Sequence, residues 1–271
     1  RMVVSELYNL LAEKTRQTQA PRKQSLRRMN RFQYHNAVTD LFNLRCAVFG
    51  LPERVARVYA NYFDPAKGRL PDTVAVGNRP LGKSQLIEPR LAGVAPFPQD
   101  LRAEHGFDTQ ADHLSLSPLL MESFLSLGQS IVQSRDFTEK NVGIWSEFFE
   151  APKKDSGPQT NVIETRLTKF LTLAFRRPVE EETLRRYVSF VTAKRADGGT
   201  FEDAMKAVAA AVIASPRFLY IYDADSQIDG AESLDPYSFA SRLSFFLWGS
   251  IPDEQLLTAA GAGMLKDEQV I

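Results

Sequence analysis

Helix-start signals that precede apolar residues at helical spacing are the feature that most constrains this chain. Asn30 stands three residues before Gln33, and Thr200 stands three residues before Asp203, the spacing of a capping box. Apolar residues at i, i+4 and i+7 follow each start, which is typical of an amphipathic helix. Three further starts are expected, at Ser117-Pro118, Asp235-Pro236 and Pro252–Glu254. These patterns predict a mainly α, multi-helical bundle.

The same rules place further helices along the chain. A first helix is expected from Val4 to Lys14, and Asn161 with Glu164 predicts another that ends before Pro178. The acidic residues at 180–182 favour the start of a helix, which Asp197-Gly198-Gly199 would end. The aromatic residues of 239–248 have the spacing of a core-facing stripe, so Phe239, Leu243, Phe246 and Leu247 are predicted to face the interior.

One long segment has no helical period. Six prolines and several glycines lie between Tyr62 and Asp112, and they predict extended or looped chain. Long loops in compact domains are usually functional or are surface insertions, so the 62–113 region is the first place to look for binding. An insertion that only decorates the surface is the equal alternative.

A change in composition suggests where the chain divides. Residues 151–159 hold two prolines, two lysines and a Ser-Gly pair, as linkers often do. We therefore expect an N-terminal helical domain with a long loop insertion over 1–150, a helical domain over 151–233, and the start of a third, truncated helical domain over 234–271.

Charge, hydropathy and cysteine content exclude several classes of function. Thirty-three Lys and Arg balance thirty-three Asp and Glu, so no net field would attract nucleic acid. No apolar run reaches the ~18 residues of a membrane span. The single cysteine, Cys46, excludes an intrachain disulfide, a Cys-based zinc site and C-x-x-C-H haem attachment. We expect no cofactor within this chain.

Catalytic signatures are also missing. The chain has no G-x-S-x-G, Walker-type or G-x-G-x-x-G motif, and its three histidines do not form His-Glu-x-x-His. His105, Asp108 and His113 lie close in sequence near the irregular segment and are the candidate binding residues. Two histidines and an acid are a weak signal, because a metal site needs three or four ligands of defined geometry, and we predict no metal. The catalytic residues stay unknown.

Several segments, taken in order, resemble domains of unknown function that recur in large secreted, cytochrome c-associated multidomain proteins of planctomycetes and related bacteria. The segments that carry this resemblance are 28–42, 106–108 with 116–120, 174–179, 215–220, and 240–248 with 251–254. Three such domains would follow one another, the last of them truncated. The stretch from Leu44 to Glu104 is longer than the resemblance leads us to expect.

The resemblance implies the kind of protein to which the chain belongs and its cellular location, but it implies no chemical reaction. It implies a helical scaffold or interaction region of an exported bacterial protein, periplasmic or extracellular, whose partners are the other domains of the same parent protein. The signal peptide and the haem domain would lie outside this fragment. Fold-level likeness does not decide function. Two alternatives stay open: part of a carbohydrate-related or redox-coupled enzyme with its site in the 62–113 loops or in other domains, and a partner- or ligand-binding module. The oligomeric state is not predicted.

Overall fold

A computed structural model describes residues 26–50, 89–98, 109, 114, 117–152, 159–222, 225–228 and 231–266. Within these ranges the protein is mainly α, as the sequence predicts, and its only strands form two short antiparallel pairs. The expected helix at 4–14, most of the irregular segment, and His105, Asp108 and His113 lie outside the described residues. No helix in the described ranges is both long enough and apolar enough to cross a membrane.

Four of the predicted helix starts are found with their caps. Helix α2 (Arg31–Phe42) and helix α6 (Phe201–Ile213) each begin with a complete capping box, on Asn30 and Thr200 respectively. Helix α3 (Pro118–Gln133) is capped by the Ser117 side chain, and helix α8 (Pro236–Leu247) by that of Asp235. Each cap satisfies backbone N–H groups that the first helical turn leaves without partners.

Two of the remaining helices begin at their predicted starts, and one begins earlier than predicted. Helix α5 (Glu181–Ala196) ends at Asp197, and helix α9 (Glu254–Gly261) is capped by Asp253. Helix α4 (Gln159–Phe175) begins before Asn161, so the predicted capping role of Asn161 is wrong. Gln159 and Thr160 already have helical backbone, and the Asn161 carbonyl accepts a bond from Thr165 Oγ1 inside the helix. The shorter elements are η5 (Trp145–Phe149), a π-helical turn, α7 (Pro216–Leu219) and η6 (Met264–Lys266).

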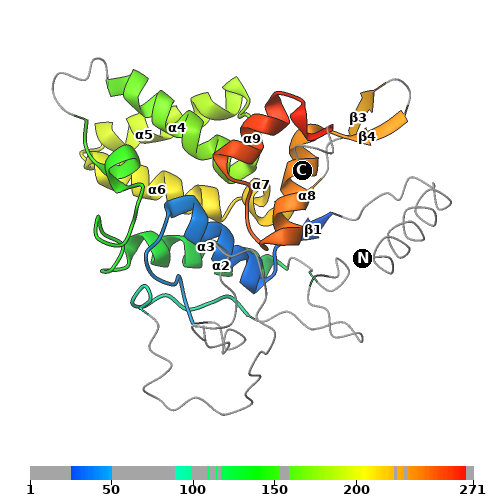
Figure 1. Cartoon of the computed structure of the whole chain (residues 1–271). Helices are drawn as coiled ribbons and strands as arrows, with labels where there is room; N and C mark the ends of the chain where they lie inside the picture. Colours follow the sequence, from blue (N-terminus) through cyan, green and yellow to red (C-terminus); the bar gives the residue numbers. More distant parts are fainter. Residues whose placement is uncertain are drawn as a thin grey trace, which may run out of the picture.

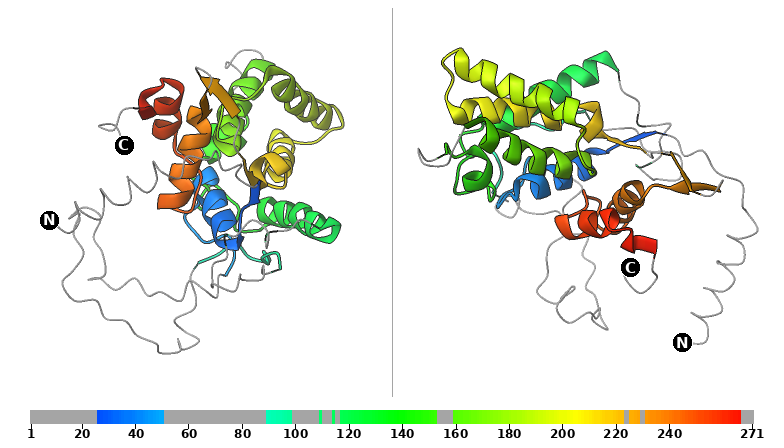
Figure 2. Two further views of the ribbon diagram at one scale, coloured as in Figure 1. Left: turned by 90° about the vertical axis from the view of Figure 1, so that its right-hand side faces the viewer. Right: turned by 90° about the horizontal axis from the view of Figure 1, so that it is seen from above.

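The two strand pairs were not predicted. Strand β1 (Arg27–Arg28) pairs with β2 (Tyr220–Ile221), which brings the chain before α2 against the chain after α7. Strands β3 (Asp225–Ile228) and β4 (Ala231–Leu234) form a hairpin before α8 that projects from the helices (Figures 1 and 2). Strands of two and four residues are too short to give a clear alternation in the sequence.

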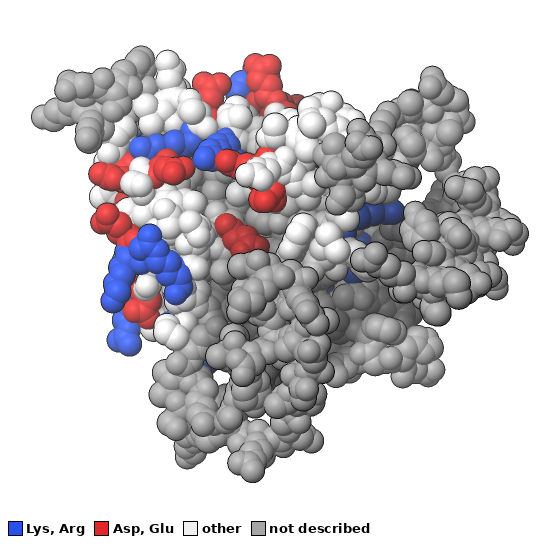
Figure 3. Space-filling model, in the orientation of Figure 1, with Lys and Arg blue, Asp and Glu red and all other residues white. Residues whose placement is uncertain are grey.

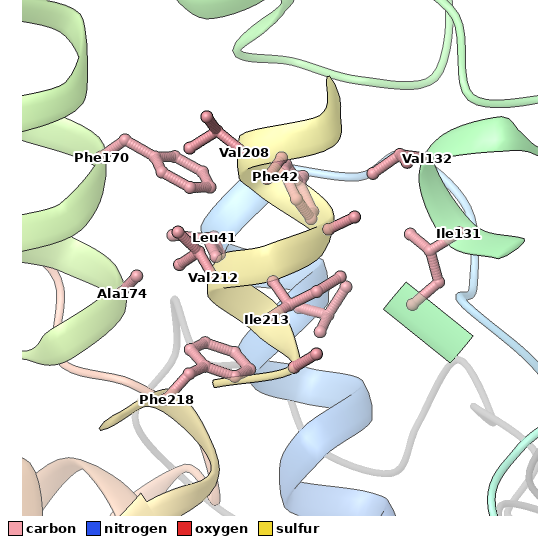
Figure 4. Packing of buried hydrophobic residues seen from close by; sticks show 14 of the residues in the cluster. Leu41, Phe42, Ile131, Val132, Phe170, Ala174, Val208, Val212, Ile213 and Phe218 are labelled. Carbon is pink, nitrogen blue, oxygen red and sulfur yellow. The ribbon is translucent and has the colours of Figure 1, made fainter. Parts of the chain in front are cut away.

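Helix α6 lies in the middle of the core. Its apolar side chains are buried against α4 on one side and α3 on the other, with Leu41 and Phe42 of α2 behind (Figure 4). One cluster of buried residues extends from Met29 to Ile251 and draws on both sides of the expected boundary at 151. The division into three units stays a prediction about the chain.

Arg176 joins the end of α4 to the α7–β2 corner. Its guanidinium is buried and donates to the carbonyl oxygens of Ala174, Arg217, Phe218 and Tyr220 at 2.6–3.3 Å. Burial lowers the pKa of Arg176 to about 10, because the interior disfavours its charged form. Three of its four acceptors belong to a segment about 40 residues away in the sequence.

Helices α3 and α6 lie close together at Gly128. A β-carbon at position 128 would lie 2.7 Å from the Ala210 carbonyl oxygen, which is backbone and has little freedom to move. Gly128→Ala should therefore lower the free energy of unfolding by about 1–3 kcal/mol through overpacking, although alanine has the higher helix propensity. Urea denaturation monitored by circular dichroism measures this loss.

Ser126→Ala is the matched control, because it raises helix propensity at an exposed position of the same helix. It should leave stability unchanged or slightly higher. Equal effects of the two variants would contradict a close approach at Gly128.

Candidate functional site

The C-terminal end of α8 exposes three successive large apolar side chains. The exposed fractions are 84% for Phe246, 54% for Leu247 and 63% for Trp248. We call these three residues the α8 apolar patch. Such residues are usually buried when they are not part of an interaction surface, so this is the candidate functional surface of the described chain.

This finding corrects the predicted orientation of α8. Phe246 and Leu247 were expected to face the core, but the buried face consists of small and hydroxyl-bearing residues with one phenylalanine, namely Ser238, Ala240, Ser241, Ser244 and Phe245. Two of the three buried serines have acceptors for their hydroxyls: Ser238 Oγ donates to the Asp235 carboxylate, and Ser244 Oγ donates to the Ser250 carbonyl at 2.8 Å. A hydrophobicity pattern counts serine as polar, and it therefore placed the interior face on the wrong side.

The patch is held in place by the turn that follows it. Gly249 has φ +63°, a left-handed conformation that glycine adopts without strain. Asn36 of α2 donates to the carbonyl oxygens of Trp248 and Gly249, each at 3.4 Å. The Ser250 hydroxyl donates to the Asp40 carboxylate of α2. These bonds fix the end of α8 on α2, so the patch faces outward from a defined backbone.

Phe32 extends the apolar surface onto α2. Its side chain is 39% exposed. A β-carbon built on Gly249 would lie 3.0 Å from Phe32 Cε1, which places the phenylalanine ring beside the turn. The apolar surface therefore combines residues that are more than 200 positions apart, which no local pattern in the sequence could indicate.

Two cavities flank the turn between α8 and α9. One, of about 570 Å³, is lined by Trp248, Asp40, Asp253 and neighbouring residues. The other, of about 730 Å³, lies between α2, η5, α4 and the start of α9 and contains Lys169 and Arg166. Asp40, Ile251, Asp253 and Gln255 line both cavities. Over this side of the protein, acidic and basic side chains alternate rather than gather by sign (Figure 3).

Lys169 links two acidic side chains across the larger cavity. Its Nζ lies 3.0 Å from Glu254 Oε1 and 3.3 Å from Glu147 Oε2. The hydrogen bond to Glu254, followed by that to Glu147, raises the pKa of Lys169, because both stabilise the ammonium form. The two acidic side chains therefore hold Lys169 as an ion-pair partner in its charged form.

Only some of the site residues proposed from the sequence lie in the described part of the structure. His105, Asp108 and His113 lie outside the described residues, so the binding site and the enzyme reading placed there stay predictions. In the described ranges, no group of three His, Cys, Asp or Glu is arranged to hold a metal. His35 is buried on α2 and packs edge-to-face on Phe49, with ring centroids 5.2 Å apart. Cys46 is half-buried beside the core, and burial raises the pKa of its thiol.

Phe245 and Phe246 provide a direct test of the α8 orientation. Phe245 is 4% exposed and its ring lies under the Arg176 guanidinium, 5.8 Å from centroid to carbon. Phe245→Ala should lower the free energy of unfolding by about 3–5 kcal/mol, as truncation of a core aromatic does. Phe246→Ala should change it by less than about 0.5 kcal/mol, as is usual at the surface. Denaturant titrations of both variants would contradict this orientation if Phe246→Ala were the more costly change.

The raised pKa of Lys169 predicts slow acylation. Amine-acylating reagents attack the neutral amine, and a raised pKa leaves less of it at pH 8. Lys169 should therefore be modified more slowly than Lys194, an exposed lysine on α5, although Lys169 is itself 61% exposed. Competitive labelling followed by mass spectrometry measures the two rates.

Glu254→Gln removes the larger cause of the shift and should speed labelling of Lys169 without changing that of Lys194. Equal labelling of the two lysines in the unaltered protein would show that the bonds at Lys169 do not persist in solution.

Comparison with known families gives three matches in order along the chain. The PSD3 family, a protein of unknown function (DUF1587), matches residues 85–136. The PSD5 family (DUF1595) matches 163–223, and the PSD4 family (DUF1592) matches 234–271, both likewise of unknown function. No curated protein and no solved structure matches the chain. The α8 apolar patch lies in the PSD4 match and Lys169 in the PSD5 match. The chain thus carries three consecutive domains of unknown function, of the PSD3, PSD5 and PSD4 types.

Proposed function

We propose that this chain is a helical interaction region of a larger multidomain protein, and that the α8 apolar patch docks another domain of that protein. The observation that carries the proposal is the exposure of Phe246, Leu247 and Trp248, whereas most other aromatic side chains in the described ranges are buried. Burying the three side chains against a partner would contribute roughly 1.5–3 kcal/mol each. Aromatic residues of this kind dominate the energetics of protein contacts.

The rigidity of the patch supports this role. Asn36 and Asp40 hold the 248–250 segment on α2 through side-chain hydrogen bonds, and α2 belongs to the main core. A surface that is already ordered loses little conformational entropy when a partner binds. A patch presented in this way suits docking better than a patch on a loop would.

The modular organisation supports a partner within the same polypeptide. Three domain types of unknown function follow one another in 271 residues, and residues from all three matches contribute to one core cluster. Domains that pack on one another in this way commonly pack on further neighbours, and contacts between the domains of a chain resemble transient protein–protein interfaces.

The cellular location of the parent protein and the nature of its other domains are also proposals. We infer that it is exported, to the periplasm or beyond the cell, and that it carries a cytochrome c-type domain elsewhere, because the sequence resembles proteins of that kind. The single cysteine of this chain does not fit covalent haem attachment, which requires two. In this arrangement the present chain would supply a scaffold, and the redox chemistry would belong to another domain.

Photo-crosslinking in the complete parent protein tests the docking surface. A benzophenone amino acid at position 246 should form crosslinks to residues outside this chain, identified by mass spectrometry. The same amino acid at position 190, where Phe190 of α5 is 40% exposed, is the control and should form few. Leu247→Ser should lower the yield from position 246 about tenfold, as loss of a central apolar contact does. Crosslinks from 246 confined to this chain would overturn the proposal.

A further inference from the structure

The smaller cavity opens beside the α8 apolar patch and shares Trp248 with it. Its volume of about 570 Å³ lies within the range of ligand-binding clefts. The polar groups that line it are Asp40, Asp253, Gln255 and two serines, and none of the described lining residues is basic. The described lining therefore combines an exposed indole with two acidic side chains and no basic one.

Neither acidic side chain forms an ion pair with a described residue. Elsewhere at this corner, Glu147 and Glu254 are paired with Lys169. Asp40 accepts the Ser250 hydroxyl, and Asp253 accepts the Leu256 N–H as the cap of α9, both neutral donors. Both side chains are exposed and retain free acceptor positions.

The chemistry of the lining favours an organic cation over other ligands. An ammonium or guanidinium group gains both from carboxylates and from the negative face of an indole ring. A metal ion does not fit, because the described residues offer no group of three metal-ligating side chains. An anion would meet two negative charges. A neutral ligand would leave both aspartates without an opposite charge.

We propose that this cavity receives a lysine or arginine side chain of the segment that docks on the α8 apolar patch. The inference rests on the proposed docking function and adds its specificity: the partner segment presents a basic residue next to an apolar one. The apolar residue covers Phe246 and Leu247, and the basic side chain enters beside Trp248, between Asp40 and Asp253. The charge pair would fix the register of a contact that the apolar patch alone leaves free to slide.

Titration with small analogues of lysine and arginine tests the cavity directly. N-acetyl-lysine methylamide and N-acetyl-arginine methylamide should each produce a saturable change in tryptophan fluorescence. The neutral analogue N-acetyl-norleucine methylamide should bind at least about tenfold more weakly, since it lacks the charge. Trp248→Leu leaves Trp145 as the single tryptophan and should abolish the response.

The variants Asp40→Asn and Asp253→Asn each remove one negative charge and keep the shape of the side chain. Asparagine keeps the acceptor for Ser250 and is an equally good helix cap, so both variants should fold normally. Each should weaken binding of the lysine probe about fivefold or more, whereas Glu181→Gln on α5 should leave it unchanged. Circular dichroism and thermal melts confirm that the variants are folded.

Three outcomes would overturn the inference: equal binding of the norleucine probe, affinity unchanged in both asparagine variants, or a response to calcium ions in place of the lysine probe. These outcomes differ from a failure of the docking proposal, which shows as missing crosslinks from position 246. Crosslinking without cation binding would leave the docking surface in place and remove the basic residue from it.

Discussion

The close approach of α3 and α6 is the constraint on which the rest of the core depends. Helix α6 is buried on most of its circumference, so every neighbouring helix must present a complementary surface to it. Because Gly128 has no side chain, the α3 backbone can approach the Ala210 carbonyl. The small side chains of Ala204, Ala209 and Ala210 let the neighbouring helices pack close to the α6 backbone. Larger residues at these points would separate the helices and open voids around Phe42, Phe124 and Phe170. The aromatic residues fill the space that the small residues define.

Polar bonds, besides apolar contacts, fix how the later part of the chain lies on this core. Arg176 crosses from the end of α4 to the carbonyls of 217–220, and Arg177 reaches the Asp235 carboxylate at 3.1 Å and Ser238 Oγ at the start of α8. Two adjacent arginines therefore tie α4 both to the α7–β2 corner and to the start of α8. A buried guanidinium with several carbonyl acceptors is costly to disturb, because removing it leaves those carbonyls without donors. This connection helps to determine where α8 begins and hence which of its residues can reach the core.

The features that could be predicted from the sequence are those that depend on residues close to one another in the chain. The caps at Asn30, Thr200, Ser117 and Asp235 could be found because each bond lies within three residues of its helix start. The β1–β2 pairing and the reach of Arg176 span about 40 residues or more, and no spacing rule relates such positions. The candidate site depends on contacts of this long-range kind, since Phe32, Asn36 and Asp40 meet residues of 248–250. Only one signal was local: residues 245–248 are all large and apolar, and at about 100° per residue they cannot all face one side of a helix.

The serines on α8 explain why the exposed aromatics are a feature of the fold and not a packing failure. A helix that turned Phe246 and Leu247 inward would have to turn Ser241 and Ser244 outward, and the bond from Ser244 to the Ser250 carbonyl would be lost. That carbonyl belongs to the residue whose hydroxyl reaches Asp40, so the same rotation would also disturb the contact with α2. The buried hydroxyls thus select the orientation in which the aromatic side chains face solvent. An arrangement that satisfies polar groups while exposing apolar side chains is favoured where a partner covers the apolar face, and this is the physical basis of the proposal that the surface docks another domain.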